Sequence, residues 1–115
     1  MARILVLHLK KKWFDKIKNF EKLEEYREIN DYWMKRLIKN GPKDGIKKGF
    51  MAVGSEQWRE FSEIHFALAY PKREDKEKWI IIKGPIKIFV GFGRTDWGAE
   101  PCKDYFIISW NKQKH

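Results

Sequence analysis

Short apolar runs separated by turn residues constrain the fold of this chain most strongly. The runs are rich in isoleucine, valine, leucine and aromatic residues, and glycine, proline or charged residues lie between them. Runs of this length and composition predict β-strands. We expect strands over residues 3–9, 63–70, 79–83, 86–92 and 105–110. The first run, RILVLHL, is apolar almost without interruption, which predicts a strand buried on both faces near the centre of a sheet or barrel.

Two other stretches have apolar residues at helical spacing. In residues 10–20 the apolar side chains share one face, which predicts a short amphipathic helix with a basic outer face. A second helix is expected at about 31–39, because Asn30 or Asp31 can cap its start and the sequence Asn-Gly-Pro at 40–42 stops it. Its inward-facing residues are predicted to be Tyr32, Trp33 and Leu37.

The remaining segments are one of ambiguous structure and three that are predicted to be loops or turns. Residues 22–29 fit a strand or a helix, and periodicity alone does not decide between them. A long loop rich in glycine and lysine is expected at about 41–62, with a turn of helix near residues 55–61. The charged residues 72–78 predict a solvated turn, and a longer segment rich in turn residues covers 93–104.

Length and composition favour one domain. The chain has 115 residues, of which 43% are hydrophobic, enough for one core but too few for two independent domains. Strands and helices do not alternate as βαβ units, and there is no internal repeat. We therefore predict a single domain over residues 1–115 with an α+β fold, a small β-barrel of about five to six strands with two to three short helices.

Residue usage also excludes several kinds of site and location. No apolar run approaches the roughly 18 residues of a membrane-spanning helix, and the opening run is too short for a signal peptide. One cysteine cannot form an internal disulfide, and three scattered histidines provide no zinc-ligand spacing. We expect a cytoplasmic protein with no metal, no cofactor, no membrane contact and no obligate protein partner.

The net charge of +9 is concentrated in the first half of the chain. Residues 1–48 contain 14 Lys and Arg against 7 Asp and Glu, whereas residues 49–115 contain 11 against 9. A concentrated positive field favours partners that carry phosphate. Lysine-rich surfaces also keep small domains in solution, so charge alone leaves both interpretations open.

A short motif early in the chain resembles the signature of the ASCH domain family. Residues 13–17 (WFDKI) match the family's "wFDkI" helix, and the K-x-x-E-x-R pattern that follows is formed by Lys22, Glu25 and Arg27. Phe20 stands where the family has a glycine, and a bulky residue would be strained there if the position needs a positive φ.

Two later stretches are similar to the bacterial and phage-associated branch of the same family. They are residues 28–37 (EINDYWMKRL) and residues 97–106, which contain WGAEP followed by KDYF. Together with the first motif they occur in the family's order and span most of the chain except residues 41–62.

The resemblance implies a PUA-like β-barrel with a cleft beside the first helix that binds RNA or a nucleotide. Some ASCH proteins are amidohydrolases that act on acetylated cytidine with a lysine, a threonine three residues later and a distant glutamate. This chain has Glu25 in place of that threonine, and a carboxylate cannot act as the hydroxyl does. If the chain is an enzyme, a nucleoside amidohydrolase or a weak ribonuclease, the predicted catalytic residues are Lys22, Glu25 and Glu100.

On an extended segment, alternation places Glu25 and Arg27 on one face, where they can pair. In the functional interpretation Lys22 and Arg27 bind a phosphate. In the structural interpretation the Glu25–Arg27 ion pair only stabilises the barrel mouth. Trp97 either stacks on a base or covers the core. The predicted RNA- or nucleotide-binding residues are Lys22, Tyr26, Arg27, Arg36 and Trp97, with Lys10, Lys11, Lys12 and Lys16 on the first helix.

Two further residues carry reactive groups. His65 lies in an apolar strand and is interpreted as a hydrogen-bonded core histidine rather than a general base. Cys102 is a weak candidate for a nucleophile, because no histidine lies near it in the sequence.

Overall fold

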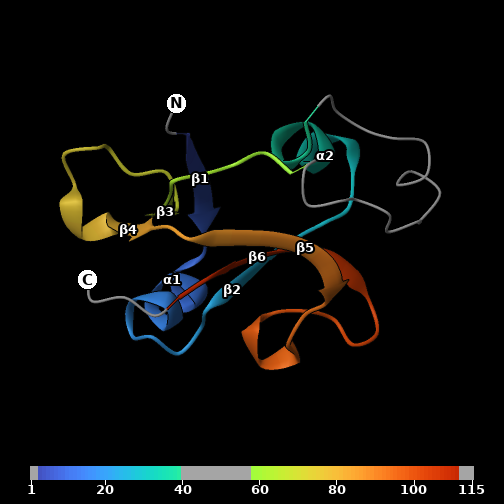
Figure 1. Cartoon of the computed structure of the whole chain (residues 1–115). Helices are drawn as coiled ribbons and strands as arrows, with labels where there is room; N and C mark the ends of the chain where they lie inside the picture. The colour runs from blue at the N-terminus through green and yellow to red at the C-terminus, as the bar shows by residue number, and fades with distance from the viewer. Residues whose placement is uncertain (1–2, 40–57, 112–115) are drawn as a thin grey trace. The chain divides into compact units, whose positions relative to one another are not determined.

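The computed structural model describes residues 3–39 and 58–111 (Figure 1). The chain divides into two compact units. In the described part of the chain, the first unit contains residues 3–24, 61–86 and 109–111. The second unit contains residues 25–39, 58–60 and 87–108. The predicted loop at about 41–62 is described only from residue 58 onward. The predicted turn of helix near residues 55–61 was wrong for its described part, because residues 58–61 contain no helix and Trp58 instead bridges to Ile38.

The first unit is built on a three-stranded sheet with the strand order β1-β3-β4. Its strands are β1 (Ile4–Leu9), β3 (Glu63–Leu68) and β4 (Trp79–Lys83). β1 runs parallel to β3, and β3 runs antiparallel to β4. The charged segment before β4 contains a short 3-10 helix, η2 (Lys76–Lys78). All three strands were predicted from their apolar runs, and β3 ends two residues earlier than expected.

Burial in this sheet corrects one prediction. The first run forms a strand as expected, but β1 lies at an edge of the sheet and its burial alternates, with Leu5 and Leu7 buried and Ile4 48% exposed. β3 is the central strand, and its residues Ile64 to Ala67 are all buried. The prediction that the first run is buried on both faces was wrong, because an uninterrupted apolar sequence does not distinguish an edge strand from a central one.

Helix α1 (Lys11–Lys18) packs against β3 in the first unit. Phe14 and Ile17 are buried, while the lysines at 11, 12 and 18 are exposed, so the predicted amphipathic helix with a basic outer face is confirmed. Phe20 follows the helix with φ at 63°, in the left-handed region that favours glycine. The chain therefore adopts the positive φ at this position with a bulky side chain, at a local conformational cost of about 1–2 kcal/mol.

The second unit carries most of a second three-stranded sheet with the order β2-β6-β5. Its strands are β2 (Glu24–Arg27), β5 (Ile86–Phe92) and β6 (Asp104–Trp110). The ambiguous segment at 22–29 is thus a strand in its middle part. The predicted strands at 79–83 and 86–92 meet at Gly84 and Pro85 as expected, but they belong to different sheets.

Helix α2 (Asp31–Leu37) is capped by Asn30, one of the two predicted candidates, whose side chain accepts a hydrogen bond from the Trp33 N–H at 2.9 Å. The helix ends before the Asn-Gly-Pro sequence, because Ile38 is already extended and bridges to Trp58. Leu37 is buried, but Tyr32 is 56% exposed, so the prediction that Tyr32 faces inward was wrong. The buried residues of α2 are Met34 and Leu37.

One buried cluster of the second unit contains an unusually close approach of the backbone to side chains. Tyr26, Ala99, Tyr105 and Ile107 form a buried cluster. A Cβ atom on Gly93 would lie 2.7 Å from the Ala99 Cβ and 2.7 Å from the Tyr26 ring. The segment after Gly93 contains a 3-10 helix, η3 (Thr95–Trp97), and places the half-buried Trp97 against this cluster.

The fold class is therefore α+β, as predicted. The described residues form six strands in two three-stranded sheets and two α-helices. No closed barrel is found among them, so the β-barrel stays a prediction. None of the helices in the described ranges is long and apolar enough to cross a membrane.

Candidate nucleic-acid interface

A buried carboxylate holds an arginine at the end of β2. Glu25 is only 4% exposed, and its carboxylate accepts a hydrogen bond from the Arg27 guanidinium in an ion pair. Arg27 also donates to the Tyr26 carbonyl at 3.0 Å, and its side chain is 17% exposed. A buried carboxylate is strongly disfavoured unless it is paired and hydrogen-bonded. The pairing predicted from strand alternation is confirmed, and it fixes the direction of the guanidinium.

The guanidinium of Arg27 lies over an aromatic residue of α2. Its Cζ is 5.3 Å from the centre of the Trp33 ring. Arg36 approaches the same ring at 6.0 Å and the Tyr32 ring at 4.5 Å, and the two rings meet edge to face at 5.0 Å. These distances lie within the range of cation–π contacts. We call Arg27, Tyr32, Trp33 and Arg36 the arginine–aromatic cluster.

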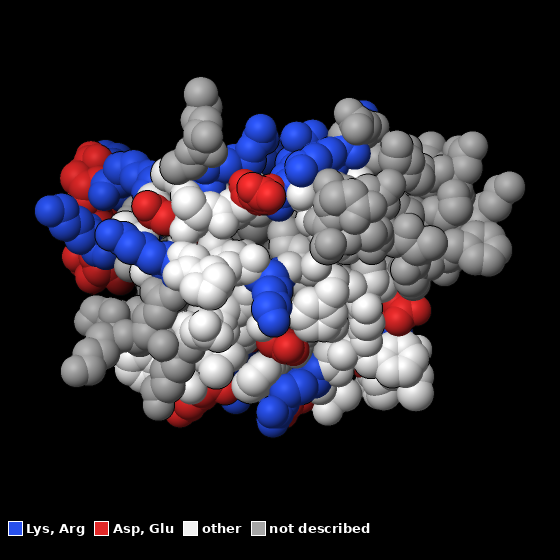
Figure 2. All heavy atoms as spheres, viewed as in Figure 1, with Lys and Arg blue, Asp and Glu red and all other residues white. Residues whose placement is uncertain are grey.

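The cluster is accessible and basic. Arg36 and Tyr32 are exposed, and Trp33 is half-buried. The Arg27 charge is balanced by Glu25, whereas no acidic partner of Arg36 lies within residues 3–39 and 58–111. The neighbouring Arg59 donates to the Lys35 carbonyl at 3.2 Å, and Figure 2 shows basic side chains over α2. The excess positive charge of this surface comes from α2 and the segment that pairs with its end.

Of the other predicted binding residues, Tyr26 is buried in the second unit and Trp97 lies half-buried against it. Tyr26 is 8% exposed, and its hydroxyl accepts a hydrogen bond from the Arg94 N–H at 2.9 Å. Trp97 packs on the same cluster, with the Arg94 guanidinium 4.2 Å from its ring centre. The packing of Trp97 matches the interpretation of this residue as a cover over the core.

Glu100 belongs to an exposed ion network. Its carboxylate lies 3.2 Å from Lys103, which also donates to Glu28 at 2.7 Å. The hydrogen bond to Glu28, followed by that to Glu100, raises the pKa of the Lys103 ammonium above the ordinary lysine range. The Glu100 backbone N–H donates to the Tyr105 hydroxyl at 3.0 Å, which fixes the loop.

The predicted lysines lie in the first unit. Lys22 is 1% exposed, and its Nζ is 4.6 Å from the Trp13 ring centre. Lys12 approaches the same ring at 4.7 Å, so both lysines lie against Trp13. Lys11 pairs with Asp15 at 2.6 Å. The other two predicted lysines differ in exposure: Lys10 is exposed and Lys16 is half-buried.

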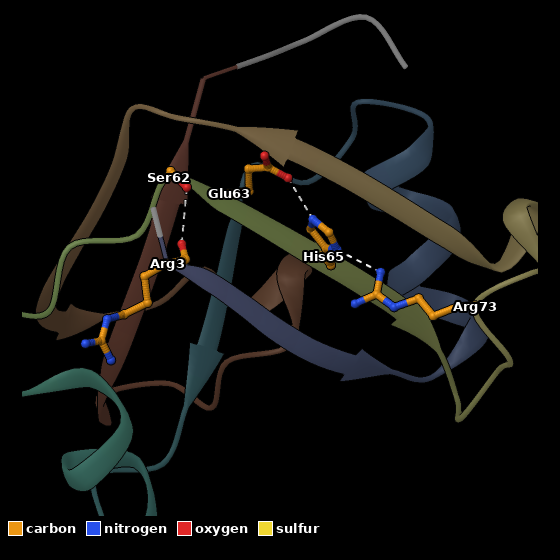
Figure 3. Close-up of polar contacts among 5 residues, drawn as sticks. All are labelled: Arg3, Ser62, Glu63, His65 and Arg73. Carbon is orange, nitrogen blue, oxygen red and sulfur yellow. Dashed lines mark hydrogen bonds and ion pairs between the residues drawn. The ribbon is translucent and has the colours of Figure 1, made fainter. Parts of the chain in front are cut away.

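His65 is a buried, hydrogen-bonded histidine, as predicted. It is 7% exposed, and its Nε2 lies 2.7 Å from the Glu63 carboxylate. Arg73 approaches the other ring nitrogen, Nδ1, at 2.8 Å (Figure 3). Both ring nitrogens are thus engaged within the first unit. Cys102, the other residue with a reactive group, is exposed.

Sequence reasoning missed the aromatic half of the cluster. Tyr32 and Trp33 were assigned to the protein interior, but they lie at the i, i+4 and i, i+3 positions relative to Arg36. Residues at these spacings face each other on a helix surface, so the pattern could have identified the contact. The contact between Trp33 and Arg27 depends on the placement of α2 against β2, which no spacing in the sequence specifies.

Comparisons with protein-family models, with curated proteins and with solved structures found no match to this chain. The resemblance to the ASCH family accordingly stays a prediction from its motifs. The function must be inferred from the geometry.

Proposed function

We propose that the chain binds single-stranded RNA or a nucleotide through the arginine–aromatic cluster, as an ASCH-like binding module. The observation that carries the proposal is the placement of Arg27 over Trp33 by a buried carboxylate, next to the exposed Arg36. Guanidinium groups bind phosphate with two parallel hydrogen bonds, and aromatic side chains stack on unpaired bases. The cluster presents both chemistries on one surface of the second unit.

Pre-organisation distinguishes this cluster from an ordinary basic helix face. Glu25 restricts the Arg27 guanidinium before any ligand arrives, and the Asn30 cap fixes the turn of α2 that carries Trp33. A ligand therefore loses less affinity to the ordering of flexible side chains. No acidic residue in the described ranges balances the charge of Arg36, so Arg36 supplies the excess positive charge that attracts a phosphate.

The test is a fluorescence-anisotropy titration of a short, mixed-sequence single-stranded RNA at two salt concentrations. Arg36→Gln should weaken binding, and because each lost phosphate contact changes the slope of log K against log salt by about 0.7, it should also flatten the salt dependence. Arg94→Gln is the matched control. Arg94 also lies over a tryptophan, but Asp96 binds its guanidinium through two hydrogen bonds at 3.0 and 2.8 Å.

The two variants remove the same charge from the same unit. Weaker binding by Arg36→Gln alone supports the cluster as the binding surface. Equal weakening by both variants would show that only net charge matters, and an absence of RNA and nucleotide binding by the wild type would overturn the proposal.

A hydrolase that acts on a modified nucleoside such as N4-acetylcytidine is the second candidate. The burial of two charged motif residues favours it. Lys22 in the first unit is 1% exposed, and Glu25 in the second unit is 4% exposed. Buried titratable groups are enriched at catalytic sites. Release of acetate from N4-acetylcytidine by the wild type, and its loss in Glu25→Gln, is the expected result. No acetate release by the wild type would exclude this substrate.

A further inference from the structure

Two ring-bearing residues, His8 and Trp79, lie on the outer face of the first unit's sheet with one alanine between them. His8 on β1 is paired with Ala67 on β3, and Ala67 is paired with Trp79 on β4. Because side chains alternate along a strand, these three lie on the face opposite the buried Leu7, Phe66 and Ile80. Ala67 lies between the two ring-bearing residues and is fully buried, whereas His8 is exposed.

Each end of this row of three residues carries a stacked pair. The His8 and Tyr70 rings are nearly parallel, with centroids 4.4 Å apart and an angle of 26° between the planes. Tyr70 is 84% exposed, the most exposed of the large apolar side chains among the described residues. At the other end, the Arg73 guanidinium lies 3.9 Å from the Trp79 ring centre. We call His8, Tyr70, Arg73 and Trp79 the stacked surface.

A hydrogen-bonded chain fixes Arg73 in this position. A guanidinium only donates, so the His65 Nδ1 must accept from Arg73, and the ring proton then lies on Nε2 and is donated to Glu63. Figure 3 shows Arg73 reaching the His65 ring from one side and Glu63 from the other. The Trp79 indole N–H also donates to the Lys72 carbonyl at 3.0 Å. Both members of this pair are therefore held in place before a ligand binds.

Charge around the stacked surface is mixed. The segment before β4 alternates basic and acidic residues, and Figure 2 shows both colours intermixed at the left edge, where Figure 1 places η2. Lys72, Arg73, Lys76 and Lys78 slightly exceed the acids Glu74, Asp75 and Glu77. A weak positive excess within a chain of net charge +9 suits a polyanion, but it cannot supply strong phosphate binding. Stacking of planar groups, rather than charge, is therefore the main interaction that this surface offers to a ligand.

We propose that the stacked surface binds unpaired bases of single-stranded RNA, one against the Tyr70 ring and one against the Arg73 guanidinium plane. The inference rests on the proposed RNA binding and adds a second contact area in the first unit. Bases stack on aromatic rings and on arginine planes with little sequence preference. The stacked surface would therefore recognise bases, whereas the arginine–aromatic cluster would also contact phosphates.

An abasic oligonucleotide separates the two contributions. Binding of a short oligoribonucleotide and of an abasic oligomer of the same length is compared by anisotropy at low and high salt. Tyr70→Ala should weaken binding of the base-containing strand by between about 5-fold and about 150-fold and leave the abasic strand unaffected. Arg73→Lys, which keeps the charge but removes the plane, should act in the same direction. Phe92→Ala is the matched control, since Phe92 is a 65% exposed ring in the second unit.

The outcomes distinguish this inference from the proposed function. If Arg36→Gln weakens both oligomers while Tyr70→Ala and Arg73→Lys leave both unchanged, the RNA-binding proposal stands and the stacked surface is wrong. Equal effects of Tyr70→Ala and Phe92→Ala would also overturn the stacked surface. If the wild type binds neither oligomer, both proposals fail together.

Discussion

Gly93 leaves no room for a side chain in the core of the second unit. A Cβ at this position would lie 2.7 Å from the Ala99 Cβ and 2.7 and 2.8 Å from two atoms of the Tyr26 ring. Carbon atoms normally approach to about 3.5–4.0 Å, so Gly93→Ala requires a displacement of roughly 1 Å. The Tyr26 ring cannot move freely, because it packs on Tyr105 and its hydroxyl accepts from the Arg94 N–H.

Overpacking of this kind destabilises proteins by about 1–3 kcal/mol. For a chain of this size, each kcal/mol lowers the melting temperature by about 4 °C, so Gly93→Ala should melt about 4–12 °C below the wild type. Thermal and urea unfolding followed by circular dichroism measure the change. Gly91→Ala is the control, because a Cβ there would meet only the Ile107 Cδ1 at an ordinary 3.7 Å.

The comparison of the two alanine variants is decisive. Both add one methyl group to the same stretch of chain, so they share any effect on the unfolded state. If Gly93→Ala melts within about 1 °C of Gly91→Ala, the close approach does not constrain the second unit and the reasoning is refuted.

Three further predictions concern the surroundings of the candidate site. Glu25→Gln removes the charge that holds Arg27 and should lower the free energy of unfolding in urea by about 2 kcal/mol. The loss is smaller than for a fully buried pair because Arg27 is partly exposed. The control Glu21→Gln, at an exposed position, should have no such effect. Asn30→Ala removes the cap of α2 and should cost about 1 kcal/mol by the same assay, while Asn30→Asp, which retains an acceptor, should remain near the wild type. Lys103→Gln should lower the melting temperature slightly and by a constant amount through neutral pH. Since the pKa of Lys103 is raised on folding, this difference should shrink only at alkaline pH, as Lys103 deprotonates, and a difference that grows with pH would contradict the assignment.

Local sequence patterns predicted the elements well. The apolar spacing of residues 10–20 correctly indicated α1, and Asn30 was one of the two predicted caps of α2, because both features depend on residues within a few positions of each other. The Glu25–Arg27 pair was also predicted, since two residues two positions apart on a strand share a face. These are contacts whose geometry the backbone period alone dictates.

Other features could not be predicted because they depend on distant segments. The run 3–9 is an edge strand, and nothing in its own sequence distinguishes this from a central strand. Tyr32 was assigned to the interior on its apolar character, yet the buried face of α2 is set by what packs against it. The hydrogen bond from Arg73 to His65 likewise requires the turn after β3 to fold back on that strand.

The sequence by itself determined the α+β class, most strand and helix positions, the basic character and the ion pair within β2. Tertiary structure decided the order of strands in each sheet, the position of Arg27 over Trp33, and the stacking of Arg73 on Trp79 beside His65. The division has a physical reason. Hydrophobic periodicity acts over a few residues and specifies which face is apolar, whereas the partner of that face is selected by packing among segments far apart in the chain.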